Sequence, residues 1–382
     1  MDESWCWESD FSVNSFLNFC IDHEILEIFN DASTNIGGYG VFCVGWQLVL
    51  VCGFICFRLG GNWSWFAVLF VFGAIPLMEL IMGAKGATLN EESLQLEAQD
   101  RWYDYLLYMI VPIQWFYVLW FCWMMGHSEP QASWQWFGLV MAMGILCGSF
   151  GINVAHELGH RTTRFEQFLA KVLLASSLYM HFFIEHNRGH HKHVGTPEDP
   201  STARMHEVVY TFWLRSMFQT WMSAWRIEAE RLRREASSPW TWRNEMLRFQ
   251  TIQLSVIIAI YLVFGGWATF SFWLAALIGG IFLETINYIE HYGLMRKKTQ
   301  SGHYEIVQPE HSWNSNHVVG RLILFELSRH SDHHYKSNKK YQTLQSIDTA
   351  PQMPTGYPGM MVLSLLVPIW FAVMNPRAKQ WQ

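Results

Sequence analysis

The sequence predicts an all-α polytopic membrane protein, with six transmembrane helices in three hairpins and a cytoplasmic, histidine-rich catalytic domain. Only 15% of its 382 residues are charged, whereas soluble domains average about 25%. Four stretches contain no Asp, Glu, Lys or Arg: 39–57, 105–128, 130–155 and 249–283. Because about 20 apolar residues cross a bilayer as a helix, these stretches predict membrane spans.

Composition also excludes other classes of protein. The net charge is −6 and no basic stripe is present, which argues against nucleic-acid binding. All seven cysteines lie in the first 150 residues, several of them in apolar stretches, so a secreted disulfide scaffold is not expected. They form no C-x-x-C pair, so we expect no rubredoxin or zinc-ribbon module, and no electron-transfer cofactor, within this chain. The first 57 residues lack Lys and Arg, so no signal peptide is predicted.

The predicted spans follow one another as three tight hairpins. They are 39–59 with 62–83, 105–126 with 133–155, and 249–265 with 269–290. Gly60-Gly61, a segment containing Pro130, and Gly265-Gly266 separate the members of each pair.

Three further segments are apolar but do not qualify as spans. The segment 11–29 predicts a helix that lies on the membrane surface or, equally, caps the soluble side. The segment 168–184 is broken by Lys171. The segment 359–375 is interrupted by Pro368 and stops at Pro376. We expect both of the latter to be interfacial or re-entrant.

Basic residues predict the orientation. If the tight hairpins face outward, only Arg58 of the 26 Lys and Arg residues lies outside, as the positive-inside rule requires. Both termini and the catalytic domain are then cytoplasmic, in a bacterial inner membrane, although an endoplasmic-reticulum protein would share this topology. The predicted order is a tail (1–38), spans one to four (39–155, with a cytoplasmic loop at 84–104), a cytoplasmic histidine segment (156–248), spans five and six (249–290), and a second cytoplasmic histidine segment (291–382).

Nine of the 17 histidines fall in four clusters, at the ends of predicted spans and in the cytoplasmic segments. They are His156, His160, His186, His190, His191, His291, His330, His333 and His334. Residues i and i+4 of a helix share a face. The pairs 156/160, 186/190 and 330/334 can therefore each aim two imidazoles at one place, and His191 and His333 can reach a second metal beside the first. Nine nitrogen ligands suit two ions, with four or five ligands each.

The chemistry of the ligands narrows the choice of metal. Imidazole suits iron, zinc, copper and nickel, but a zinc site takes four ligands, or three and a water. The segment 156–160 (HELGH) keeps the spacing of a zinc protease motif, yet the chain supplies six to seven further ligands. In a membrane setting, such a set favours two oxygen-activating irons. The remaining histidines are predicted to be non-ligands: His23, His127, His181, His193, His206, His303, His311 and His317.

Carboxylates accompany the histidines, and metal-bound histidines usually donate their outer N–H to a carboxylate or carbonyl. We expect this role first for Glu157, Glu290 and Asp332, with a carboxylate that bridges the metals as the alternative. Asp199 and Glu284 are candidates for the same role. Glu185 is interpreted as surface charge.

Several motifs resemble those of the AlkB-type integral-membrane alkane 1-monooxygenases, which are non-haem di-iron alkane hydroxylases. The similarity extends over about residues 40 to 381. The matching segments are 153–161 (NVAHELGHR), 182–204 (FFIEHNRGHHKHVGTPEDPSTAR), 287–296 (NYIEHYGLMR), 311–317 (HSWNSNH) and 327–344 (LSRHSDHHYKSNKKYQTL). Membrane desaturases, sterol hydroxylases and xylene monooxygenases share the histidine pattern, but the strings NYIEHYG, TPEDP and HSDHH with YQTL are more specific. The chain departs from the family at Arg161, where a lysine is common, and in its acidic, cysteine-containing N-terminal tail.

The resemblance implies terminal hydroxylation of n-alkanes, with O₂ as oxidant and two irons as cofactor. It implies that electrons come from NAD(P)H through a rubredoxin reductase and a separate rubredoxin. The family's metal-binding histidines match the nine clustered histidines, in agreement with the spacing.

Selectivity for a methyl terminus must come from shape, since a methyl group offers no hydrogen bonds. A narrow channel between helices would supply that shape. Two kinds of position are channel candidates. Some residues share a helix face with His156 or His291, and one position is where the family's second helix can carry a bulky aromatic. The candidates are Ile145, Ser149, Ile152, Gly280, Glu284, Asn287 and Val71, although close helix packing would also explain the small ones. Valine at position 71 suggests a deep channel and long alkanes.

A cytoplasmic electron donor requires a docking surface. Rubredoxins are acidic, and the candidate docking residues are Arg296, Lys297, Lys298, Lys336, Lys339 and Lys340. The positive-inside bias alone would also place these residues there.

Two alternative functions remain at this point. The first is another membrane enzyme with histidine boxes, a fatty acyl desaturase or a xylene-type methyl hydroxylase. The second is a metal transport protein. Transport sites lie mid-membrane on spanning helices, whereas these histidines lie at span ends and in soluble segments, which favours an enzyme.

Overall fold

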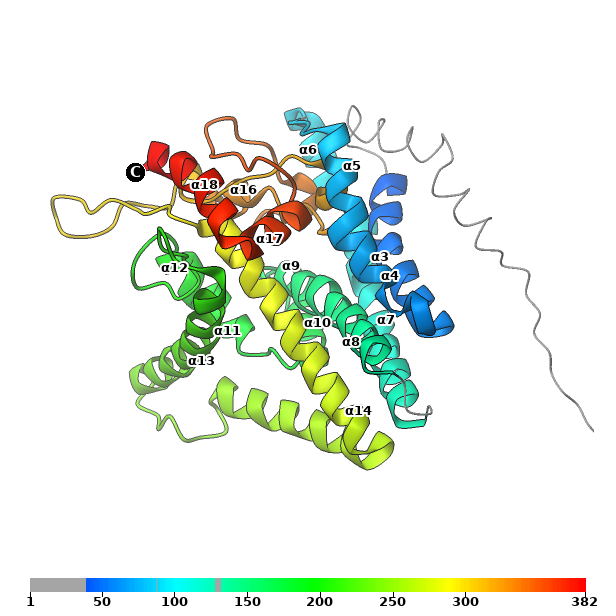
Figure 1. Ribbon diagram of the computed structural model, residues 1–382. Coiled ribbons are helices and arrows are strands. Elements are labelled where there is room, and N and C mark those ends of the chain that lie inside the picture. Colours follow the sequence, from blue (N-terminus) through cyan, green and yellow to red (C-terminus); the bar gives the residue numbers. More distant parts are fainter. Residues whose placement is uncertain (1–38, 87, 128–131) are drawn as a thin grey trace, which may run out of the picture.

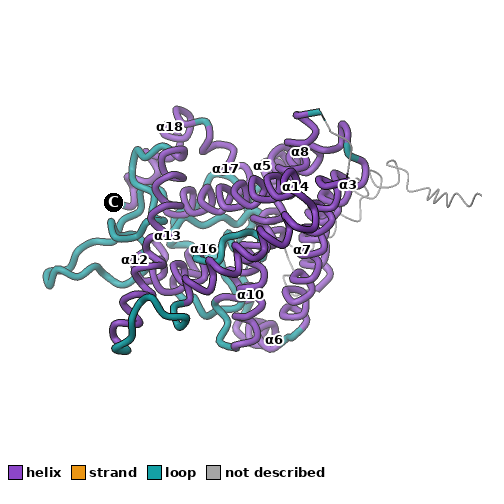
Figure 2. Tube along the Cα trace, turned by 90° about the horizontal axis from the view of Figure 1, so that it is seen from below, coloured by secondary structure: helices purple, strands orange, loops and turns teal. Residues whose placement is uncertain are grey.

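A computed structural model describes residues 39–86, 88–127 and 132–382 of the chain (Figure 1). Within these ranges every extended regular element is a helix, and three isolated β-bridges join loops. Helices make up most of this part of the chain, and one long loop extends outward beyond them (Figure 2). The all-helical class is therefore confirmed, while the predicted helix at 11–29 lies outside the described residues.

Four helical runs are long and apolar enough to cross a membrane, which supports a membrane protein. They are Gly61–Met82, Trp102–His127 (α7), Ser133–Gly159 and Glu245–His291 (α14). The helix α3 (Tyr39–Leu59) precedes them. These runs begin and end within a few residues of the predicted spans. The run Ser133–Gly159 continues past the predicted end at residue 155, so His156 lies within this helical run.

Two of these runs change their helical pitch along their length. The run Gly61–Met82 comprises a 3₁₀ turn (Gly61–Trp65), α4 (Phe66–Leu69), a π-helical turn (Phe70–Ala74) and α5 (Ile75–Met82). The run Ser133–Gly159 comprises α8 (Ser133–Leu146), a π-helical turn (Cys147–Asn153) and α9 (Val154–Gly159). Such turns occur mostly at functional sites, and both lie beside the cavity described below.

The third predicted pair of spans is divided at the expected position. The 47 residues of α14 form two helical arms that meet at one non-helical residue, Gly265 (φ 83°, ψ 176°). Only glycine adopts this backbone region readily. The second arm begins a few residues before the predicted position 269, because one glycine suffices for the change of direction. The two arms of α14 diverge from this point (Figure 1).

The outer faces of the long helices carry exposed apolar side chains, as a lipid-facing surface requires. Ile81 on α5 is 77% exposed and Leu262 on α14 is 75% exposed, far more than a packed core would leave. The inner faces pack together, and α14 contacts α7, α8 and α13. The four cysteines at positions 52, 56, 122 and 147 are buried.

Shorter helices lie beyond the ends of the long ones. They are α6 (Glu91–Gln99), α10 (Arg164–Ser176), α11 (Phe182–Glu185), α12 (His191–His193), α13 (Val209–Arg234), α15 (Val318–Ile323), α16 (His330–Tyr335), α17 (Tyr357–Leu365) and α18 (Val367–Ala378), with single 3₁₀ turns at Pro309–His311, Tyr341–Thr343 and Lys379–Trp381.

The two short apolar segments form helices too short to cross a bilayer. In the first, α10 has 13 residues. The second is broken at Leu366 into α17 and α18, because Pro368 lacks the N–H that would continue the first helix and its ring clashes with the carbonyl four residues before it. The expected stop at Pro376 was wrong: α18 continues through it to Ala378, since a proline in the last turn removes few helical hydrogen bonds.

Candidate metal centre

The nine clustered histidines come together in two adjacent groups. Five imidazole nitrogens, from His156, His160, His186, His191 and His333, lie within 4.8 Å of one another. Four others, from His190, His291, His330 and His334, form the second group. The groups are neighbours, since the rings of His191 and His334 stack with centroids 4.5 Å apart. Helix α9 with its C-cap residue His160, helices α14 and α16, and the segment 186–193 supply all nine side chains.

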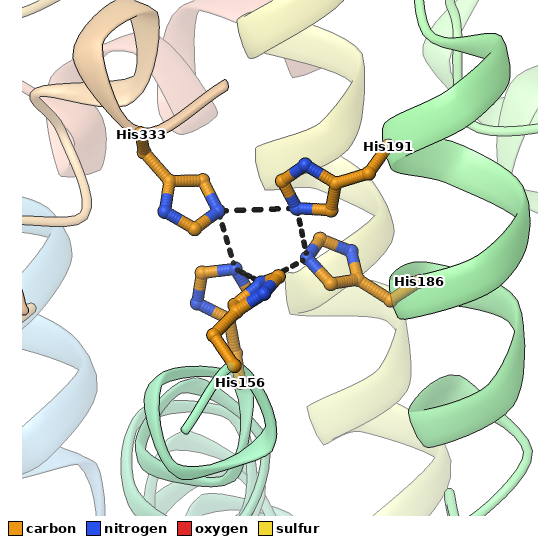
Figure 3. Close-up of side chains that lie close together, drawn as sticks. His156, His186, His191 and His333 are labelled. Carbon is orange, nitrogen blue, oxygen red and sulfur yellow. Dashed lines mark hydrogen bonds between the residues drawn. The ribbon is translucent and has the colours of Figure 1, made fainter. Parts of the chain in front are cut away.

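The five-histidine group has its Nε2 atoms turned inward (Figure 3). Neighbouring Nε2 atoms are 3.0 Å apart between His156 and His333, 3.0 Å between His186 and His191, and 3.2 Å between His191 and His333. Metal–nitrogen bonds to histidine are about 2.1 Å long. Ligands at right angles around one ion would therefore be about 3.0 Å apart, so these residues fit a metal.

The four-histidine group has the same inward arrangement. The Nε2 atoms of His190 and His334 are 3.2 Å apart, and those of His291 and His330 are 3.1 Å apart. All four residues are buried.

Burial keeps the imidazoles neutral. It lowers the pKa of His160, His186 and His191 well below the usual value, and the neighbouring imidazoles lower it further. The pKa of His333 falls to about 3, mainly through burial. Because metals bind the deprotonated ring, these side chains are in their ligating form at neutral pH. A cluster of neutral nitrogens with no cation between them would leave lone pairs facing each other.

One expected pairing of histidines is wrong. His186 and His190 are four residues apart, but they belong to different groups, and His191 takes the predicted place beside His186. Residues His186–His190 form a π-helical turn, closed by a hydrogen bond from the His191 N–H to the His186 carbonyl. In such a turn residue i+5, not i+4, returns to the same face. The expected i, i+4 pairs hold for His156 with His160 and for His330 with His334.

Two of the predicted carboxylates touch histidines of the four-histidine group. The Asp199 carboxylate lies 3.0 Å from His190 Nδ1 and also accepts a hydrogen bond from the Thr202 hydroxyl. Burial alone would raise the pKa of Asp199, but the His190 ring and the Thr202 hydroxyl hold it below its usual value. The Glu290 carboxylate lies 3.2 Å from His330 Nε2 and accepts a hydrogen bond from the Tyr357 hydroxyl at 2.8 Å.

Two further predicted partners, Glu157 and Asp332, contact groups other than histidines. Glu157 pairs with Arg161 at 2.8 Å and accepts the N–H of Tyr341. Asp332 pairs with Lys339 at 2.7 Å and accepts the N–H of Gln345. Both carboxylates thus fasten histidine helices to the segment after α16.

The sequence predicted that Glu185 carries a surface charge, and this prediction was wrong. This residue is 2% exposed, and burial together with the charges of Asp199 and Glu284 raises its pKa well above the usual value. The expectation failed because α13 covers this side of α11, which local sequence does not reveal.

The structure also gives the positions of His181 and His193, which were predicted to be non-ligands, and of the basic residues predicted to dock an electron donor. His181 and His193 belong to neither group, and His193 pairs instead with Glu198 at 3.0 Å. Of the docking candidates, Lys297, Lys298 and Lys336 are exposed. Lys339 and Lys340 hold Asp332 and Asp104, and Arg296 donates to backbone carbonyls.

A narrow apolar cavity leads to both histidine groups. The cavity has a volume of about 60 Å³, and its lining includes His156, His186 and His330. Four channel candidates line it: Val71, Ile145, Ser149 and Asn287. Ile152, Gly280 and Glu284 lie outside its lining, because the π-helical turn Cys147–Asn153 and the packing of α13 change which faces of the helices meet it.

Sequence reasoning missed other lining residues. Phe182 stacks on His186 with centroids 4.6 Å apart, and Phe72, Leu327 and Met361 also line the cavity. Their apolar character was visible, but long-range packing alone brings α17 and the segment 323–327 to the cavity.

Comparison with known proteins gives relatives over most of the chain. The fatty acid desaturase family model matches residues 132–364. Alkane 1-monooxygenase 2 of Pseudomonas aeruginosa is 39% identical over 324 residues, which are 84% of this chain and 85% of the relative. Alkane 1-monooxygenase 1 of Alcanivorax borkumensis is 37% identical over 358 residues, 94% of this chain and 84% of the relative. The hydroxylase component of a Pseudomonas putida xylene/toluene monooxygenase is 28% identical over 340 residues, 87% of this chain and 88% of the relative.

Replacing His191 should weaken metal binding, whereas replacing His193 should not. His191→Ala removes a nitrogen from the five-histidine group and should lower metal affinity at least about tenfold, since even outer partners of ligands contribute that much. His193→Ala is the matched control. Metal content measured by mass spectrometry after chelator competition distinguishes them, and equal retention by both variants would contradict the ligand assignment.

Proposed function

The chain belongs to the alkane 1-monooxygenase family, and we propose that its two histidine groups hold two irons that use O₂ and electrons from a rubredoxin. Hydroxylation of alkanes at the terminal carbon is the activity of this family. One observation carries the proposal: inward-facing histidine groups of five and four close the end of an apolar cavity. Such a nitrogen-rich set fits a non-haem iron enzyme.

The cavity positions the substrate by shape. Apolar side chains such as Val71, Ile145 and Phe182 surround an alkane chain and exclude water. Since an alkane offers no hydrogen bond, only the dimensions of the cavity select which carbon reaches the histidines. The terminal methyl group arrives first at the narrow end.

The polar groups around the histidines set proton positions. The Asp199 carboxylate accepts the Nδ1–H of His190, which leaves Nε2 of that ring free to bind a metal. The Tyr357 hydroxyl donates to Glu290 and orients its carboxylate toward His330. Because Glu290 contacts the inward Nε2 of His330 and not its outer Nδ1, this carboxylate would itself hold a metal, as the alternative predicted from the sequence has it. When bound, the irons supply reductive activation of O₂ and insertion of one oxygen atom into the terminal C–H bond.

We propose six transmembrane helices with both termini and the histidine domain in the cytoplasm of a bacterium. The apolar runs described above and the bend at Gly265 support six spans. The concentration of basic residues on one side supports the orientation. The segments 156–248 and 291–382 then form the cytoplasmic domain.

Product analysis tests the reaction. The iron-loaded protein in nanodiscs, with rubredoxin, its reductase and NADH, should convert a ladder of n-alkanes to 1-alkanols that carry ¹⁸O from ¹⁸O₂. Reactions without rubredoxin should give no product. Mass spectrometry would instead find an unsaturated acyl product from a saturated acyl-CoA if the protein were a desaturase.

Residue 71 should set the depth of the cavity. Val71 is 9% exposed and lines the cavity, so Val71→Trp should fill its far end and shift the preferred alkane to one several carbons shorter. Leu69→Trp is the matched control, because Leu69 is 67% exposed on the outer face. Gas chromatography of the products gives the chain-length profile, and an unchanged profile in Val71→Trp would refute the role.

We place the rubredoxin contact at Lys297, Lys298 and Lys336, since these are the exposed members of the basic set. The double variant Lys297→Glu/Lys298→Glu should raise the apparent KM for rubredoxin severalfold at low salt, because attraction to an acidic partner becomes repulsion. High salt should remove the difference. Arg234→Glu, at the end of α13, is the control; an unchanged KM in the double variant would exclude this surface.

A further inference from the structure

A second groove lies outside the cavity, between α13 and the two arms of α14. Met217 and Trp221 of α13 form one wall, Ile257 of the first arm another, and Leu277 of the second arm a third. The arms diverge here because of the bend at Gly265 (Figure 1). The groove is therefore open on the face where the long helices expose apolar side chains.

The turn between α10 and α11 forms the floor of this groove and carries a polar atom. His181 lines the groove and is 6% exposed, and its Nε2 has no hydrogen-bond partner among the described residues. Burial lowers the pKa of His181 to about 4, so the ring is neutral. A buried polar atom without a partner destabilises the fold, and a ligand with one hydroxyl would supply that partner.

One layer of side chains separates the groove from the reaction cavity. The Tyr179 hydroxyl donates to Glu284 at 2.8 Å, and the Asn287 amide, which lines the cavity, donates to the same carboxylate at 3.3 Å. Gly280 lies beneath Tyr179: a Cβ there would be 3.0 Å from the ring. The expected channel residues Gly280 and Glu284 therefore belong to this dividing layer.

We propose that the groove binds the primary alkanol after it leaves the cavity, with its hydroxyl on His181 Nε2 and its chain along the apolar walls; this rests on the proposed function. The polar and apolar groups of the groove favour an alcohol over an alkane or an anionic lipid. An alkane leaves Nε2 without a partner, and an anionic head group would find no Lys or Arg in the lining of the groove. A neutral hydroxyl can donate to or accept from either tautomer of the ring.

Photolabelling of the full-length protein in nanodiscs tests this proposal. The probe is a 1-dodecanol that carries a diazirine in mid-chain, and the matched control is the same chain without the hydroxyl. Peptide mass spectrometry should find the alcohol probe on 217–221 and 273–277, and excess 1-dodecanol should compete while dodecane should not. His181→Leu should reduce this labelling about fivefold, as the loss of one hydrogen bond to a neutral group predicts.

Two further variants protect the test against misfolding. His181→Gln keeps a hydrogen-bonding group and should retain most of the labelling. Leu277→Trp fills the groove without touching His181 and should abolish it. Equal labelling by the two probes, or unchanged labelling in His181→Leu, would overturn the proposal. Formation of labelled 1-alkanol is measured separately, so failure of the reaction and failure of the groove are distinguishable.

Discussion

Nine imidazoles that face one another inside a largely buried space are the constraint on which the rest of the structure depends. Their nitrogens repel unless a cation lies between them, and each ring loses hydration on burial. The surrounding chain must therefore hold them together from several directions. Helices α9 and α14 bring three of the rings from the membrane side, while α16 and the segment 186–193 bring six from the other side.

Ion pairs fasten these two sides to each other. Asp104 at the start of α7 lies 3.3 Å from Arg161 and 2.8 Å from Lys340, so one carboxylate ties a spanning helix to both histidine-bearing regions. Arg161, the departure from the family pattern, also pairs with Glu157. Removal of one member of such a buried pair is strongly destabilising, because it leaves an uncompensated buried charge.

The sequence allowed the helical class, the approximate ends of the apolar runs and the nine histidines to be predicted, because hydropathy and i, i+4 spacing are local signals. It did not allow the division of the histidines to be predicted, since this depends on the π-helical turn at His186–His190. The burial of Glu185 and the contribution of Tyr357 depend on segments distant in sequence. The sequence predicted a break at Gly265. It did not reveal the backbone angles of this residue, which determine whether the chain forms a loop or a sharp bend there.

The division of the histidines into groups has a mechanical consequence. His190 and His191 are neighbours in the chain but belong to different groups, and the same is true of His333 and His334. Two single peptide units, each fixing a Cα–Cα distance of about 3.8 Å, therefore link one centre to the other. Covalent geometry sets the spacing of the centres, so a bridging ligand is not required for it. Movement of one histidine group would therefore pull directly on residues of the other, so the two groups behave as one stiff unit.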